Sequence, residues 1–344
     1  MNHLSTNPGK FKNGLLYFTC LGILFLAAGC RKGSDIPEPK LTISTLATGL
    51  AGPLGLEYDK HGNVWIAETG TGHNDGRVSV IKQNGQRYDA IVNFESIILE
   101  AGIAEGPGHL LFADGLLYIT GPRGKLFKAN VSSFQPGNTP IDASTLAVEN
   151  IGDFVLAYPF VNNTHETHLY GITKGPGGAI YITDAGANAV IRRSPSGALS
   201  MVAEIPGIVN PLPFGPPFIQ SVPTSIIYEN GKFLVTAFLG FPFPEGKSII
   251  YNLTPSGNVS IFQDGLTSLV DIAKGGQKGQ LVVQHGVFGA MGWTPNTGKL
   301  IWANGTNAIE LTTGLNLPSG ITQTNSHTWY ISSLGDNSVL KVTY

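Results

Sequence analysis

Charged side chains are scarce in this sequence of 344 residues. Lysine, arginine, aspartate and glutamate make up 13% of the chain, and 21 basic against 23 acidic residues leave a formal net charge of −2. Proteins that bind nucleic acid need a basic surface that neutralises phosphate groups. The near-neutral balance therefore argues against a nucleic-acid partner and leaves small molecules, glycans and proteins as candidate ligands.

Cysteine is nearly absent as well. The two cysteines, Cys20 and Cys30, both lie within the first thirty residues. We therefore expect no disulfide in the folded part of the chain, which must rely on a core that its length permits. The sequence also has no G-x-S-x-G nucleophile turn and no glycine-rich segment between a strand and a helix. Serine-hydrolase chemistry and nucleotide phosphate binding therefore have no support.

An apolar stretch near the N-terminus, Gly14–Ala28, follows the basic residues Lys10 and Lys12. It is too short for a comfortable membrane span and is typical of a signal peptide. The stretch leads into Leu-Ala-Ala-Gly-Cys, which resembles a bacterial lipobox. This resemblance implies cleavage before Cys30 and a lipid on its thiol, with an ordinary signal peptide or an uncleaved anchor as the alternatives.

These features predict three segments. Residues 1–29 form a lipoprotein signal peptide, residues 30–40 a lipidated cysteine and flexible tether, and residues 41–344 the folded part. Because arginine, not aspartate, follows Cys30, resemblance to lipoprotein sorting favours the outer membrane. We expect a monomer held at the cell envelope through its lipid, facing the periplasm or the cell surface.

Glycine and short strands at a regular spacing are what the sequence has in abundance. A strand-like core recurs six times, and the intervals range from 48 to 63 residues. The cores are Val64–Glu68, Leu117–Gly121, Ile180–Asp184, Phe233–Ala237, Leu281–His285 and Trp329–Ser333. Another apolar strand precedes each core, and a third and a fourth strand follow most of them. The fifth unit, around residues 291–293, is the weakest match.

The sixth unit lacks a fourth strand, and Leu41–Leu50 at the front of the fold supplies its equivalent. The segment LATGLAGP at residues 46–53 echoes LTTGLNLP at residues 311–318. A first strand that completes the last unit closes a ring and removes exposed sheet edges. The sequence therefore predicts an all-β fold, a six-bladed β-propeller with four-stranded blades closed by the N-terminal strand.

The repeats resemble NHL-type blades, most clearly in PLGLEYDKHGNVWIAETGTG at residues 53–72. A closer resemblance is to the ScyD/ScyE family of exported propellers, and it extends from about residue 46 to residue 275. SVPTSI at residues 221–226 and FLGFPFPEG at residues 238–246 carry much of that likeness. The resemblance implies an exported propeller and assigns no reaction.

The start of strand one and the end of strand two lie on the same face of a propeller, which we call the channel mouth. Functional residues commonly gather on the loops of that face. The candidates at these positions are Glu68, His109, Asp184, Ser225, Asp271 and His285. Glu68 and Asp184 precede glycine turns, where a carboxylate often caps backbone N–H groups, so a structural role is favoured for both. His109 and His285 are either functional or solvated rim residues.

Two segments suggest a metal. His165, Glu166 and His168 occur together, although their spacing in a loop differs from the helical H-E-x-x-H of zinc proteases. Glu105 before Gly-Pro resembles the opening of gluconolactonase-type blades, which implies a calcium ligand, with Asp271 as the only good partner. Calcium and zinc both stay open as cofactors.

Two proline-rich loops belong on the same face. Asn210–Pro223 carries Phe214 and Phe218, and Gly240–Gly246 carries Phe241 and Phe243. Stiff loops lower the entropy cost of binding, so the four rings form either a ligand surface or a self-packed lid. The sequence favours a binding or scaffold module for a small molecule, glycan or protein. The alternative is a metal-dependent lactonase- or lyase-type enzyme at the channel mouth.

Overall fold

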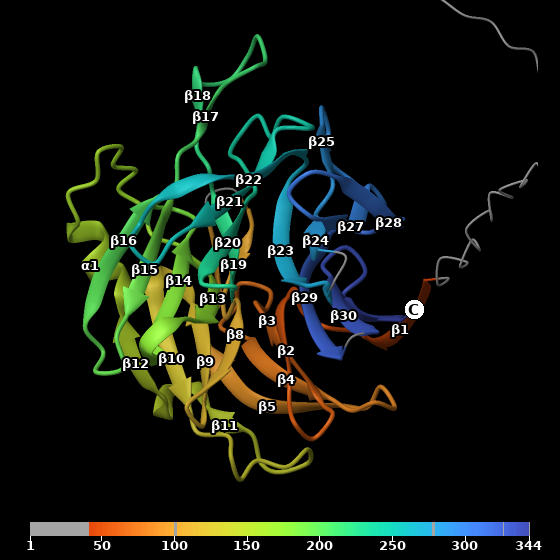
Figure 1. Ribbon diagram of the computed structural model, residues 1–344. Helices are drawn as coiled ribbons and strands as arrows, with labels where there is room; N and C mark the ends of the chain where they lie inside the picture. The colour runs from red at the N-terminus through yellow and green to blue at the C-terminus, as the bar shows by residue number, and fades with distance from the viewer. Residues whose placement is uncertain (1–40, 100–101, 277–278, 326, 344) are drawn as a thin grey trace, which may run out of the picture. The chain divides into compact units, whose positions relative to one another are not determined.

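The computed structural model describes residues 41–99, 102–276, 279–325 and 327–343. The predicted signal peptide, Cys30 and the tether lie outside the described residues. The described chain forms six sheets that are arranged as the blades of a β-propeller, each built on four antiparallel strands (Figure 1). The predicted fold is therefore confirmed.

The first three blades follow one another along the chain. Blade 1 consists of β2 (Pro53–Tyr58), β3 (Val64–Glu68), β4 (Gly76–Ile81) and β5 (Arg87–Phe94). Blade 2 consists of β8 (Leu110–Ala113), β9 (Leu116–Gly121), β10 (Lys125–Ala129) and β12 (Ala147–Asn150). Blade 3 consists of β13 (Leu169–Lys174), β14 (Ile180–Asp184), β15 (Ala189–Arg193) and β16 (Leu199–Glu204).

The last three blades complete the ring. Blade 4 consists of β19 (Pro223–Glu229), β20 (Lys232–Ala237), β21 (Ser248–Leu253) and β22 (Val259–Leu266). Blade 5 consists of β23 (Leu269–Lys274), β24 (Gln280–Gln284), β27 (Gly298–Ala303) and β28 (Ala308–Leu315). Blade 6 consists of β29 (Pro318–Asn325), β30 (Thr328–Ser333), β31 (Ser338–Thr343) and β1 (Thr42–Thr48).

The first strand of the fold closes the ring, as the sequence predicts. β1 is the outer strand of blade 6 and pairs antiparallel with β31. Ile43 lies opposite Val342, and Ala47 lies opposite Val339. This pairing covers the edge of the last blade with a strand from the beginning of the fold.

Several elements lie outside the four-stranded pattern. They are the pairs β6 (Ile97–Ile98) with β7 (Ala104–Glu105), β17 (Ile208–Val209) with β18 (Phe218–Ile219) and β25 (Val287–Gly289) with β26 (Gly292–Thr294), the added strand β11 (Ile141–Asp142) and the helix α1 (Ile151–Ala157). The weak fifth repeat is explained by β25 and β26. They form a hairpin inserted after strand two, and the third strand of blade 5 follows at Gly298. No helix among the described residues has the length and apolar character needed to cross a membrane.

The second strand of each blade is packed between neighbouring sheets. Every residue of β3 and of β14 is buried. A strand that is covered on both faces reads as a continuous apolar run, which is why these cores stand out in the sequence. Between blades 1 and 2, for example, Phe94 and Phe127 meet edge to face with ring centroids 5.1 Å apart.

A buried hydroxyl links neighbouring blades. A bulge near the start of β13 interrupts its pairing with β14 and leaves the Gly171 N–H without a partner carbonyl there. The Thr183 hydroxyl accepts from this N–H at 2.8 Å and donates to the Thr224 carbonyl of blade 4 at 2.6 Å. Thr120 donates in the same way from blade 2 to the Tyr170 carbonyl of blade 3 at 3.2 Å.

Blades 4 and 6 also use hydroxyls to reach the next blade. Thr224, which is hydrogen bonded to Thr236, donates to the Leu269 carbonyl of blade 5 at 2.9 Å. Ser319 donates to the Pro53 carbonyl of blade 1 at 2.7 Å. Each hydroxyl therefore satisfies a buried backbone carbonyl that belongs to the neighbouring blade.

The two blades without such a hydroxyl are joined differently. In blade 1 the Gly55 N–H donates directly to the Gly108 carbonyl of blade 2 at 3.0 Å. In blade 5 the carboxylate of Asp271 accepts from the Ile321 N–H of blade 6 at 2.7 Å. Asp271 thus takes over a contact that hydroxyls make elsewhere.

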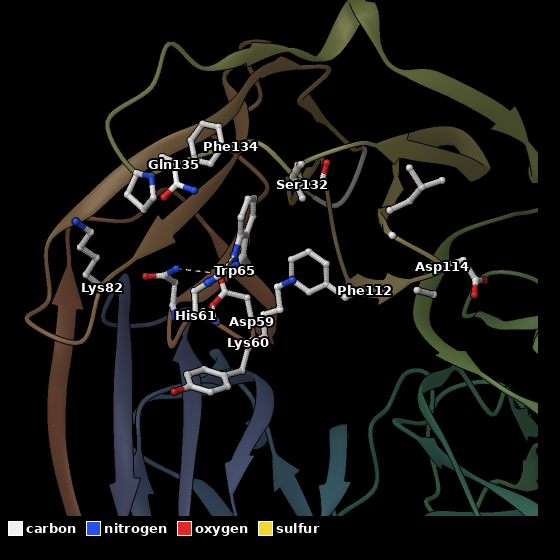
Figure 2. A pocket seen from close by; sticks show the side chains of 17 residues that line it. Asp59, Lys60, His61, Trp65, Lys82, Phe112, Asp114, Ser132, Phe134 and Gln135 are labelled. Carbon is white, nitrogen blue, oxygen red and sulfur yellow. Dashed lines mark hydrogen bonds between the residues drawn. The ribbon is translucent and has the colours of Figure 1, made fainter.

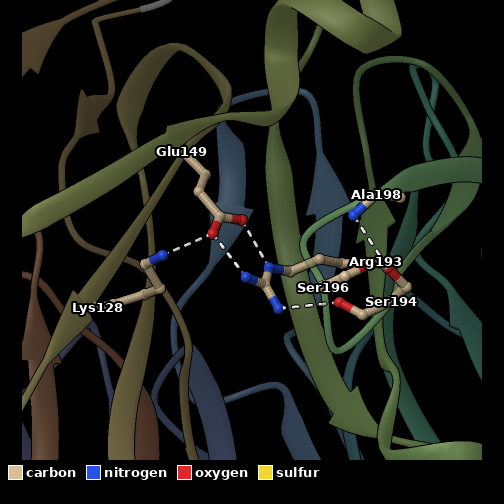
Figure 3. Close-up of polar contacts among 6 residues, drawn as sticks. All are labelled: Lys128, Glu149, Arg193, Ser194, Ser196 and Ala198. Atoms are coloured by element: carbon tan, nitrogen blue, oxygen red, sulfur yellow. Dashed lines mark hydrogen bonds and ion pairs between the residues drawn. The ribbon is translucent and has the colours of Figure 1, made fainter.

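An ion-pair cluster joins the outer parts of blades 2 and 3 (Figure 3). The carboxylate of Glu149 on β12 accepts hydrogen bonds from Arg193 Nε at 2.5 Å and Arg193 Nη2 at 2.6 Å. It also accepts one from Lys128 Nζ at 2.6 Å. The side chain of Arg193 is 8% exposed and that of Glu149 is 23% exposed. Hydrogen bonding to Arg193 is the main cause that lowers the pKa of Glu149.

Replacing Thr183 by valine tests the hydroxyl link. Valine keeps the shape of the side chain but leaves the Gly171 N–H and the Thr224 carbonyl without this partner. We expect the free energy of unfolding to fall by about 2–3 kcal/mol, measured by urea denaturation. Thr313→Val, on the exposed part of β28, is the matched control. Equal stability of the two variants would contradict the role assigned to the hydroxyl.

Replacing Glu149 by glutamine tests the ion-pair cluster. We expect a loss of about 1–2 kcal/mol at pH 7, because solvent screens a pair that is partly exposed. The pKa of Glu149 lies below its ordinary value of 4.5 in the folded protein. Its contribution is therefore complete above pH 4.5 and is lost as the pH falls through the folded-state pKa. The measurement is the free energy of unfolding of the unchanged protein and of Glu149→Gln at pH 7 and pH 3. The same difference between the two proteins at both pH values would contradict this account.

Candidate functional site

The third residue of strand one faces the neighbouring blade at the channel mouth. Glycine occupies this position in three blades, as Gly55, Gly171 and Gly320. A Cβ atom on Gly171 would lie 2.5 Å from the Thr224 carbonyl oxygen, so the neighbouring strand leaves no space for a side chain. The corresponding residues of the other three blades are His109, which lies just before β8, Ser225 of β19 and Asp271 of β23, and all three are buried. The structure thus brings three of the predicted candidates into one ring.

Asp271 is held on both sides. Its carboxylate accepts from its neighbour Ile272 N–H at 2.8 Å and from Ile321 N–H at 2.7 Å, and the Ser225 side chain also hydrogen bonds it. Burial raises the pKa of Asp271 to about 6, and these hydrogen bonds oppose a larger rise. The carboxyl group is therefore mostly ionised at neutral pH and takes up a proton under mildly acidic conditions.

His109 lies against Tyr170 of blade 3, with ring centroids 4.5 Å apart. Burial, with a smaller contribution from the charge of His168, lowers the pKa of His109 to about 3. The imidazole is therefore neutral at physiological pH. Its Nε2 atom is buried and has no hydrogen-bond partner among the described residues. A buried polar atom without a partner is uncommon and calls for an explanation, of which a role in the chemistry of the channel is one.

Two residues of the channel, Tyr170 and Glu57, were not predicted from the sequence. Burial and the charge of Asp271 raise the pKa of Tyr170, so its phenol stays protonated. Burial is also the main cause that raises the pKa of Glu57 to about 8, and the charge of Asp271 adds to it. Glu57 stands two residues after Gly55, on the same face of β2 and deeper in the channel. This period of two was the signal that could have found it.

Glu68 and Asp184 are embedded in the turns that follow strand two. Glu68 accepts from the Ala51 N–H at 2.7 Å and from the Ser79 hydroxyl. Asp184 accepts from the His168 N–H at 2.8 Å and from the Ala187 N–H at 2.9 Å. Both side chains are fully buried, so their contacts are those of structural caps.

His285 belongs to a cluster of aromatic rings at the mouth. Its Nδ1 lies 3.0 Å from the Pro318 carbonyl oxygen, and burial lowers its pKa. Its ring centroid lies 5.0 Å from that of Trp293. His285 is therefore placed beside the apolar loops and not in the ring of His109 and Asp271.

The mouth aromatic cluster consists of Phe238, Phe241, Phe243, Phe288 and Trp293. Neighbouring ring centroids lie 4.8 to 6.4 Å apart. Phe214 lies at the edge of this cluster, with its ring centroid 6.5 Å from that of Phe241. Phe218 lies in the β17–β18 hairpin and has no ring contact among the described residues. The inserted hairpin of blade 5, with Phe288 and Trp293, is the partner that the sequence did not reveal. Phe241 is 51% exposed, so the cluster presents an apolar surface beside the mouth.

The predicted metal ligands do not assemble. Glu105 and His168 are paired, with Oε1 and Nδ1 3.1 Å apart, but His165 and Glu166 are exposed. In the described ranges, no group of three or more His, Cys, Asp or Glu side chains could hold a metal ion. The oxygens of Asp271 are engaged by backbone N–H groups and Ser225. These residues do not fit a calcium or zinc site, and we derive no step through a metal.

The channel thus combines groups with different protonation states. At neutral pH Asp271 is ionised, Glu57 is protonated and His109 is neutral. Two carboxyl groups whose surroundings push their pKa values apart are suited to act as base and acid. The arrangement can therefore move protons on a small molecule that enters the mouth.

No family model matches the chain, and no curated protein matches it. Solved structures share its architecture. Virginiamycin B lyase from Staphylococcus aureus is 18% identical, with a TM-score of 0.51 over 89% of this chain and 99% of that chain. The PQQ-bound aldose sugar dehydrogenase from Streptomyces coelicolor is 13% identical, with a TM-score of 0.57 over 88% and 98%. A gluconolactonase from Xanthomonas campestris is 11% identical, with a TM-score of 0.56 over 88% and 89%. Likeness at these identities shows the six-bladed propeller fold alone.

Proposed function

We propose that the protein is an enzyme of the lyase or lactonase kind whose site is the channel mouth. The feature that carries this proposal is the pair of carboxyl groups Asp271 and Glu57 in the same channel, where burial raises the pKa of Asp271 to about 6 and that of Glu57 to about 8. The unpaired Nε2 of His109 supplies a contact for a bound molecule. Similar folds named as a lyase and a gluconolactonase support this class of reaction.

The channel residues have distinct roles in such a reaction. In an elimination, Asp271 takes a proton from the carbon next to a carbonyl group, the carbon–oxygen bond breaks, and Glu57 protonates the departing oxygen. In lactone opening, Asp271 takes a proton from water as the water oxygen bonds to the carbonyl carbon, the bond from that carbon to the ring oxygen breaks, and Glu57 protonates the ring oxygen. His109 and Tyr170 orient the substrate through hydrogen bonds. The mouth aromatic cluster holds its apolar part.

A binding module is the second candidate, and the mouth aromatic cluster favours it. An exposed group of rings on stiff loops can recognise a small molecule, a glycan or a protein without any reaction. This candidate needs no titrating group in the channel. The resemblance to the ScyD/ScyE family fits either candidate, because it assigns no reaction.

The location is part of the proposal. The lipobox-like segment before Cys30 supports a lipid anchor at the cell envelope, with the outer membrane favoured by Arg31. The tether of residues 30–40 then leaves the propeller in an aqueous compartment. A propeller without a disulfide in its described residues suits this location if its core is large.

The pH dependence of turnover tests the paired carboxyl groups. The two test substrates are gluconolactone and quinupristin, the compound present with an inactive virginiamycin B lyase in one of the similar structures, and we expect turnover of at least one. Because Asp271 must be ionised and Glu57 protonated, kcat/KM should rise through about pH 6 and fall through about pH 8. Asp271→Asn should lower kcat/KM by about 100-fold, and Glu57→Gln should remove the alkaline limb.

Asp336→Asn is the matched control, because Asp336 lies on a turn after strand two and bonds Asn316 and Ser333. It should keep the profile of the unchanged protein. If neither compound is turned over, or if Glu57→Gln keeps the alkaline limb, the acid–base assignment is wrong. Binding without turnover would then support the binding module.

Labelling with radioactive palmitate in a Gram-negative host tests the lipid anchor. We expect label in the unchanged protein and in Cys20→Ser, because the predicted cleavage removes Cys20. Cys30→Ser should carry no label. Label that persists in Cys30→Ser would show that the lipid site is elsewhere or that the leader is not a lipoprotein signal.

A further inference from the structure

A cavity of about 570 Å³ lies between blades 1 and 2 (Figure 2). Its lining includes Tyr58 at the end of strand one and Asn63 just before strand two of blade 1. The channel mouth is formed by the opposite ends of these strands. The cavity therefore opens on the other face of the propeller, and the proposed function makes no use of it.

One long connection builds the outer wall of the cavity. Strands three and four are joined by residues 82–86 in blade 1, 194–198 in blade 3, 254–258 in blade 4 and 304–307 in blade 5. In blade 2 they are joined by residues 130–146, which contribute five of the lining residues. Loops of this length in a compact fold are uncommon and are often functional.

The long connection is fixed at both ends. Near its start, Asn130 accepts from the backbone N–H of Ser132 at 3.1 Å and from its hydroxyl at 2.7 Å. Near its end, β11 pairs with β5, and Asn93 donates to Asp142 at 2.7 Å. The loop is therefore held against blade 1, and the cavity is formed without a ligand.

Aromatic rings form the apolar part of the lining. The centroid of Trp65 lies 5.5 Å from that of Phe112 and 5.7 Å from that of Phe134, both edge to face. Phe112 and Phe134 are only partly buried, so part of each ring is free to contact a ligand. Figure 2 shows these rings around the space between the two blades.

The charged side chains of the lining differ in whether they are free to pair with a ligand. Asp59 accepts from Trp65 Nε1 and Asn63 Nδ2, each at 2.9 Å, and hydrogen bonds hold its pKa below its ordinary value. Asp114 is paired with Lys174 at 2.5 Å. By contrast, the side chains of Lys60 and His61 have no hydrogen bond or ion pair among the described residues. Lys60 therefore offers a cationic group that is free to pair with an anion.

We propose that this cavity binds a small molecule with a planar apolar body and an anionic group. The body contacts Phe112 and Phe134, and the anion pairs with Lys60 at the rim. A preformed apolar pocket with a few polar groups is the usual form of a small-molecule site. The site is separate from the channel mouth and does not depend on the function proposed for it.

Two fluorescent probes that differ in charge test this proposal. They are 1-anilinonaphthalene-8-sulfonate and the uncharged N-phenyl-1-naphthylamine, titrated into the whole protein. Ser132 is exposed and lines the cavity, so Ser132→Phe fills it without disturbing the core. We expect this variant to weaken binding of both probes by about tenfold or more. Lys60→Glu should weaken the sulfonate by about fivefold and leave the uncharged probe unchanged.

Ser133→Phe is the matched control, because Ser133 is exposed on the same loop but does not line the cavity. It should bind both probes like the unchanged protein. Phe241→Ala reports any binding to the mouth aromatic cluster. The proposal is overturned if neither probe binds, if Ser132→Phe and Ser133→Phe behave alike, or if Lys60→Glu affects both probes equally.

Discussion

The contact on which the rest of the structure depends is the hydrogen bond that a buried hydroxyl makes from one blade to the next. Bulges near the starts of the inner strands leave buried backbone groups unpaired within their own sheets, and such groups need another hydrogen-bond partner. Thr183 shows the solution, since one hydroxyl accepts an N–H from its own blade and donates to the next. A single oxygen thus fixes the distance and the orientation of two sheets.

This constraint also shapes the channel mouth. At Gly171 the neighbouring blade lies so close that the inner strand has no room for a side chain. In blade 5, which lacks the hydroxyl, the carboxylate of Asp271 makes the contact with the next blade instead. Asp271 is therefore both a link between blades and the base of the proposed reaction. Burial at this position raises the pKa of Asp271, whereas a carboxylate in water would keep its ordinary pKa.

The repeat could be read from the sequence because each blade is a complete local unit. Its buried second strand gives an apolar run, and the displaced strand Leu41–Leu50 indicated closure. The third strand of blade 5 was obscured, because the β25–β26 hairpin separates it from strand two. Within the candidate site, positions followed from the fold, so His109, Ser225 and Asp271 could be placed together. Protonation states could not be predicted, since the pKa of Glu57 depends on burial among residues distant in sequence.

The low charge content gives these buried groups their importance. A chain with few ionisable side chains has little need to bury them, because each costs free energy unless it is paired. Glu68, Asp184 and Glu149 offset that cost through hydrogen bonds or cationic partners. Glu57 accepts backbone hydrogen bonds from Tyr58 and Phe112, but burial outweighs them and shifts Glu57, like His109, toward its neutral form. Stability alone would be served better by apolar residues at these two positions. Their presence in one channel therefore favours a role in chemistry over a role in packing.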